Sequence, residues 1–128
     1  MKIRITFTLL LTVLALSLTL ITSADITSRI KFAKGKSSAT VSGSVVRGDR
    51  ENFLVGAKAG QTMTVKITSL EDNAAFQIEG PDGEYLPGVA EGDDAVSFRG
   101  SLPGTGDYKI IVGGTRGNTT YRLTVSIK

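Results

Sequence analysis

Carboxylates are the side chains of this sequence best suited to acid–base chemistry or to holding a metal. Glu91, Asp93 and Asp94 lie within four positions, and Glu71 and Asp72 form a second acidic pair. Hard oxygen ligands of this kind suit calcium, but their spacing is not that of an EF-hand loop. Two carboxylates could also hydrolyse a glycoside, although nothing in the sequence directs a pair into one cleft. We predict a solvated acidic loop, with weak calcium binding as the alternative.

Two residue types that usually carry catalysis are missing, because the chain contains neither Cys nor His. It therefore has no thiol nucleophile and no imidazole base, and a zinc or copper site is not expected. We predict a protein that is not an enzyme, carries no cofactor or metal and acts by binding.

Arg116 is the strongest candidate for a binding residue. It lies between Gly113-Gly114 and Gly117-Asn118, in a segment with little apolar content. A guanidinium at a loop tip can enter a partner's cleft and bind a carboxylate with two hydrogen bonds. The alternative is an ordinary solvated arginine. Tyr108 offers a similar choice between a partner contact and a core residue whose hydroxyl reaches the backbone at a sandwich corner.

The elements that must position these residues are short strands with two-residue alternation. Gly, Asp, Asn and Pro separate them, as in Gly80-Pro81-Asp82-Gly83, which has strong turn chemistry. No helical stripe follows the first 24 residues, so we predict an all-β, antiparallel β-sandwich with hairpin-like connections. The expected strands lie at 30–32, 39–46, 53–55, 62–68, 76–78, 96–98, 108–113 and 121–127.

The first 24 residues have the layout of a secretory signal peptide: a basic head, an apolar run from Ile5 to Ile21 and small residues at the exit. A membrane anchor is the competing interpretation. We predict a signal peptide at 1–24 and one domain at 25–128, with no stable membrane insertion after cleavage. Loss of Lys2 and Arg4 leaves 13 basic residues against 12 acidic ones, so the net charge falls from +3 to +1 and nucleic acid is not an expected partner.

Several short motifs of the expected domain carry a resemblance to a known family. They are Ile30-Lys31-Phe32-Ala33-Lys34-Gly35-Lys36-Ser37-Ser38-Ala39, Ser42-Gly43, Ala57-Lys58-Ala59-Gly60-Gln61, Ser101-Leu102-Pro103, Gly106-Asp107-Tyr108, Thr115-Arg116 and the strand closing at Tyr121. Together they resemble the periplasmic inhibitors of goose-type (g-type) lysozyme. The Leu-Pro…Gly-x-Tyr part is also similar to the broader bacterial pre-peptidase C-terminal domain.

This resemblance implies a jelly-roll or pre-peptidase C-terminal-like sandwich, in the periplasm or secreted, whose loops plug the active-site cleft of a g-type lysozyme. It matches Thr115-Arg116 to the family's arginine loop, and Phe53, with Asp49 and Arg50 before it, to a tyrosine-rich loop. The expected partner-binding residues are therefore Arg116, Thr115, Asp49, Arg50, Phe53 and Tyr108.

Two other functions fit the sequence. The chain could be a non-catalytic module that binds glycan or another envelope or secreted protein, for which Tyr85 is the best surface aromatic. It could also be an envelope assembly protein, which should then expose a long edge strand or an apolar patch. Oligomeric state is open at this stage.

Overall fold

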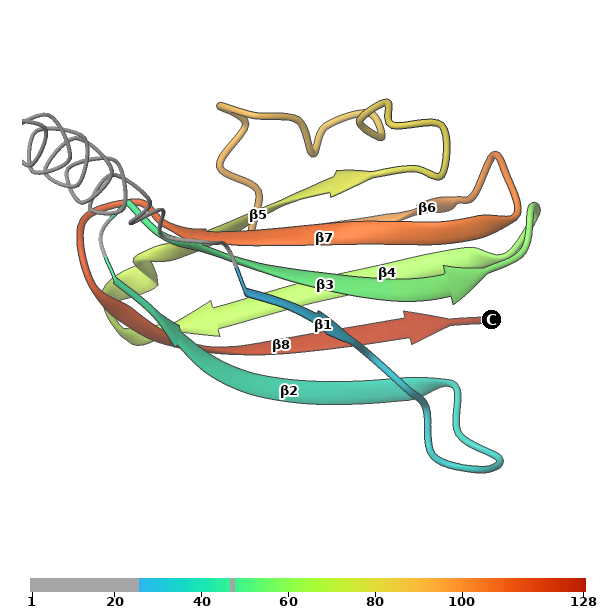
Figure 1. Ribbon diagram of the computed structural model, residues 1–128, viewed down its shortest axis with the longest axis horizontal. Helices are drawn as coiled ribbons and strands as arrows, with labels where there is room; N and C mark the ends of the chain where they lie inside the picture. Colours follow the sequence, from blue (N-terminus) through green and yellow to red (C-terminus); the bar gives the residue numbers. More distant parts are fainter. Residues whose placement is uncertain (1–25, 47) are drawn as a thin grey trace, which may run out of the picture.

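The computed structural model describes residues 26–46 and 48–128, which form two four-stranded sheets (Figure 1). The predicted signal peptide lies outside these residues. The strands are β1 (Ile26–Arg29), β2 (Ser38–Val45), β3 (Arg50–Ala57), β4 (Thr62–Ser69), β5 (Ala74–Glu79), β6 (Ser97–Ser101), β7 (Gly106–Gly114) and β8 (Thr119–Ile127). One 3-10 turn, η1 (Leu70–Asp72), is the only helical element in the described part of the chain. The predicted all-β sandwich is confirmed.

The chain alternates between the two sheets with every successive strand. One sheet has the order β1-β3-β7-β5 and the other β2-β8-β4-β6. The expectation of hairpins is therefore wrong, because each glycine-rich connection crosses to the opposite sheet. Antiparallel pairing is confirmed for every strand pair except β1 with β3, which is parallel.

The core lies between the sheets and follows the predicted alternation. Met63 and Val65 of β4 face inward, as do Leu123 and Val125 of β8, and all four are essentially inaccessible to solvent. Complete burial of such a side chain stabilises the fold by about 1.5–3 kcal/mol. A core built of many of them explains how a domain without disulfides holds together.

One buried polar pair interrupts this core. The Tyr121 hydroxyl and Glu51 Oε1 are both buried, and neither forms a hydrogen bond of good geometry, although the Glu51 carboxylate lies beside the hydroxyl. Each would lie within 3 Å of a Cβ added at Gly43, so the glycine makes the room they occupy. Burial raises the pKa of Tyr121, and the neighbouring Glu51 carboxylate raises it further.

The opening strand differs from the expected one. β1 covers 26–29 rather than 30–32, and its four residues are all exposed. It is fixed by a two-bond ion pair, in which Arg29 Nη1 and Nη2 donate to the Asp107 carboxylate oxygens at 2.9 and 2.7 Å. These hydrogen bonds, with the charge of the guanidinium adding to them, lower the pKa of Asp107. Ile30 follows the strand and buries its side chain in the core.

A long connection, residues 80–96, runs along the outer edge of β5; we call it the strap. Carbonyl oxygens of Glu84, Val89 and Ala95 accept the edge N–H groups of Gly80, Ile78 and Phe76 at 2.8–3.0 Å. The strap begins at the predicted Gly80–Gly83 turn, which the Gly83 N to Gly80 O bond of 3.0 Å closes. It leaves this edge without free donors, which protects the sheet from pairing with other chains.

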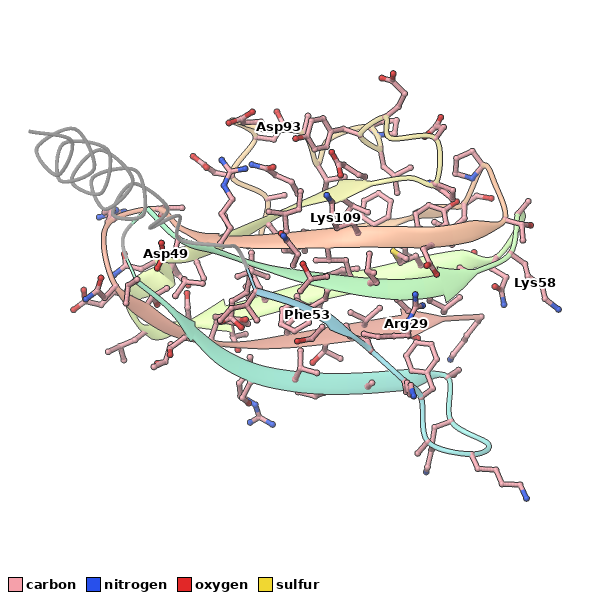
Figure 2. All side chains as sticks on the ribbon, in the orientation of Figure 1. Arg29, Asp49, Phe53, Lys58, Asp93 and Lys109 are labelled. Carbon is pink, nitrogen blue, oxygen red and sulfur yellow. The ribbon has the colours of Figure 1, made fainter. Side chains whose placement is uncertain are left out.

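Three connections meet at one end of the sandwich, which we call the arginine end: residues 46 and 48–49, residues 70–73 and residues 115–118. The register places them together, because Arg50 pairs with Gly113, Ala74 with Gly114 and Val45 with Thr119. The connections 58–61 and 102–105 form the opposite end. Figure 2 shows Asp49 and Lys58 at these two ends.

Candidate functional site

The loop between β7 and β8 presents Arg116 to solvent. Among the described residues the guanidinium has no ion-pair partner. Thr115, one position before, donates its backbone N–H to the Asn73 carbonyl oxygen at 2.7 Å. This bond braces the base of the loop against the neighbouring connection. The arginine is thus exposed and free to bind, while the backbone that carries it is held.

Two glycines allow the chain to reverse direction in the loop between β7 and β8. Gly117 has a φ of +107°, which residues with a side chain rarely adopt. A Cβ at Gly114 would collide with the Gly117 carbonyl oxygen, so only glycine allows the two backbone segments to approach this closely.

A polar groove of about 350 Å³ adjoins this loop on the β3–β7–β5 sheet. Asp49, Arg50 and Thr115 line it from the arginine end, and Glu91 and Asp94 line it from the strap. Arg50 Nη2 lies 3.3 Å from Glu91 Oε1, which joins the strap to the start of β3. The structure therefore brings four of the six predicted site residues to one end: Asp49, Arg50, Thr115 and Arg116.

The predicted binding role is wrong for the other two residues, Phe53 and Tyr108. Phe53 is only 7 % exposed, and its ring packs edge-on against Tyr121 with centroids 6.5 Å apart. Tyr108 is completely buried. Their places in β3 and β7 point both side chains into the core, so neither offers a surface to a partner.

The corner role of Tyr108 is confirmed. Its hydroxyl donates to the Gly104 carbonyl oxygen at 2.6 Å and accepts the Gly104 N–H at 3.2 Å. The tyrosine thereby fixes the turn before β7, at the end opposite Arg116.

Two of the carboxylates considered for calcium are engaged in other contacts. Asp93 Oδ2 accepts the Ala90 N–H at 2.9 Å, and Glu91 contacts Arg50. Within residues 26–46 and 48–128, no three acidic side chains are grouped closely enough to hold a metal ion. The same residues include no helix long and apolar enough to cross a bilayer.

Two apolar residues of the arginine end escaped the sequence analysis. Leu70 is 75 % exposed and Val46 is 52 % exposed. The signal available was that Leu70 ends the alternation of β4 and stands directly before the acidic pair Glu71 and Asp72.

Comparison with solved structures finds three informative matches. A periplasmic lysozyme inhibitor of g-type lysozyme from Aeromonas hydrophila, PliG, is 38 % identical with a TM-score of 0.67, over 82 % of this chain and all of that one. A mutant of the Escherichia coli PliG is 28 % identical with a TM-score of 0.65, over the same shares.

The third match shows the fold alone. It is the pre-peptidase C-terminal domain of a Bacillus anthracis collagenase, 18 % identical with a TM-score of 0.60, over 84 % of this chain and all of that domain. No protein-family model matches the sequence, and no curated protein matches it.

Proposed function

Since the chain belongs to the family of periplasmic lysozyme inhibitors of g-type lysozyme, we propose that it inhibits a g-type lysozyme by inserting Arg116 into the active-site cleft. The observation that carries the proposal is the exposed, unpaired guanidinium on a loop braced by the bond from Thr115 to Asn73. The relatives are inhibitors and not enzymes, and this chain acts in the same way, without catalysis of its own.

The chemistry of inhibition follows from the target. Glycoside hydrolysis by lysozymes depends on active-site carboxyl groups. A guanidinium is always charged and donates two parallel hydrogen bonds to a carboxylate, so Arg116 would occupy the substrate's place and neutralise an essential group. A braced loop loses little conformational freedom on binding, which favours affinity.

The residues around Arg116 complete the proposed contact. Thr115 holds the loop base, and Asp49 and Arg50 line the adjoining groove. Lysozyme side chains at the mouth of the cleft would meet this polar groove. The inhibitor acts in the periplasm or outside the cell, after removal of residues 1–24, as the single domain 25–128.

The test is inhibition of peptidoglycan lysis by a g-type lysozyme. Arg116→Ala should raise the inhibition constant by about thirtyfold or more, equivalent to about 2 kcal/mol for an interface anchor. The inhibition constant of Arg116→Lys should fall between those of the unaltered protein and Arg116→Ala, because an ammonium cannot make the paired contact. Lys58→Ala is the matched control, since it removes an exposed positive charge at the opposite end. Absence of inhibition by the unaltered protein, or equal inhibition by Arg116→Ala, would contradict the proposal.

A further inference from the structure

Leu70 is the most exposed large apolar side chain in the described part of the chain, at 75 %. Val46 lines the same shallow hollow as Leu70, together with Asn118 and Thr119. Exposed leucines occur singly on many surfaces. Two apolar residues sharing one hollow at the end that carries Arg116 form a patch, which we call the Leu70–Val46 patch.

The backbone around Leu70 is held in an unfavourable conformation. Glu71 and Asp72 have φ values of +58° and +54°, and left-handed residues with side chains cost on the order of 1 kcal/mol each. The Ala74 N–H donates to Ser69 Oγ at 3.0 Å and the Asn73 N–H to the Leu70 carbonyl at 3.3 Å. These bonds hold the turn and keep Leu70 outside the core.

Leu70 is also close to the arginine loop. Its carbonyl oxygen contacts the Asn73 N–H, and the Asn73 carbonyl oxygen accepts the Thr115 N–H. With standard backbone dimensions, these contacts place the Leu70 carbonyl within about 10 Å of the Thr115 nitrogen. A stable protein interface covers about 800 Å² on each partner, a disc roughly 15 Å in radius. An interface of this size centred on the arginine loop would reach Leu70.

From this continuity we infer that the Leu70–Val46 patch is the apolar contact of the inhibitory interface and packs against apolar side chains on the rim of the lysozyme cleft. The inference rests on the proposed function, because it takes the partner of Arg116 as the partner of Leu70. It adds a second kind of contact to the interface. Arg116 recognises charge inside the cleft, whereas Leu70 and Val46 exclude water beside it, as apolar residues around an interface anchor commonly do.

The experiment measures inhibition constants of single variants against the same g-type lysozyme. Leu70→Ala should weaken inhibition about tenfold, and Val46→Ala about threefold, because less apolar surface is removed. Leu70→Glu should weaken inhibition more than Leu70→Ala, since it places a charge in a contact that excludes water. Tyr85→Ala is the control, because Tyr85 is an exposed apolar side chain bridged to Glu79 at the other end. Thermal melting of each variant checks folding, which an exposed position should leave unchanged.

The outcomes separate the two proposals. If the unaltered protein does not inhibit, the proposed function fails and this inference falls with it. If Arg116→Ala weakens inhibition while Leu70→Ala and Leu70→Glu match the unaltered protein, the inference is overturned and the proposed function stands. Weaker inhibition by the Leu70 variants, with Tyr85→Ala unaffected, supports both.

Discussion

Two buried tyrosines allow one hydroxyl hydrogen bond to be weighed against burial alone. Tyr108 and Tyr121 are 0 % and 3 % exposed, so Tyr→Phe removes the same atom from nearly the same environment. The Tyr108 hydroxyl bonds both backbone groups of Gly104, whereas the Tyr121 hydroxyl has only the Glu51 carboxylate beside it and forms no hydrogen bond of good geometry. The same substitution should therefore cost more stability at Tyr108 than at Tyr121.

The magnitude follows from the bonds that are lost. Each hydrogen bond contributes about 1 kcal/mol net, so Tyr108→Phe should lower the free energy of unfolding by about 2 kcal/mol. With an unfolding entropy of roughly 0.2 kcal/mol/K for a domain of about 100 residues, the melting temperature should fall by about 8–10 °C. Tyr121→Phe removes a hydroxyl whose burial the Glu51 carboxylate compensates only in part, so the free energy of unfolding should change by less than about 1 kcal/mol.

Thermal and urea unfolding of the mature domain, followed by circular dichroism, measures both variants. The m-value should be unchanged, because neither substitution alters the surface exposed on unfolding. Equal losses for the two variants, or a larger loss for Tyr121→Phe, would refute the reasoning. Such a result would mean that the Tyr121 hydroxyl is satisfied in solution or that the corner bonds contribute nothing.

Two further predictions concern ionisable groups. Burial raises the pKa of Tyr121, so the folded state keeps a proton that the unfolded chain releases above about pH 10. Stability should therefore fall as pH rises beyond 10, and urea titrations should show a smaller fall for Tyr121→Phe. Arg29 lowers the pKa of Asp107, so the ion pair adds stability above about pH 4 that is lost as pH falls through the lower folded pKa. Amide signals of β1 should shift in this acid range in NMR spectra, and Asp107→Asn should remove the shift.

The strands could be predicted from the sequence, but their partners could not. Alternation in 62–68 and 121–127 identifies β4 and β8 nearly to the residue, because one face of each is buried. Glycine-rich connections look the same in sequence whether the chain returns within a sheet or crosses to the other one. β1 could not be predicted either, because an edge strand with four exposed residues has no alternation to detect.

The placement of the candidate site residues could be predicted where it depends on loops and not where it depends on side-chain direction. Asp49, Arg50, Thr115 and Arg116 lie in or beside turns, and turns at the same end of a sandwich come together. Phe53 and Tyr108 fit a binding role in composition, but the register of β3 and β7 turns them inward. Leu70 is the opposite case, because a leucine beside a strand is expected in the core from the sequence.

The two ends of the sandwich differ in whether their polar groups are hydrogen-bonded and whether their apolar side chains are buried. At the end away from Arg116, Gly60 N–H bonds the Leu102 carbonyl at 2.9 Å and Leu102 N–H bonds the Gln61 carbonyl at 2.8 Å. The Leu102 side chain is buried there, so this end closes on itself. The arginine end instead keeps an exposed leucine, an unpaired guanidinium and two left-handed acidic residues. Folding alone would favour burying the leucine and relaxing the turn. Because this end retains costs that the other end avoids, we propose that it is the end organised for a partner.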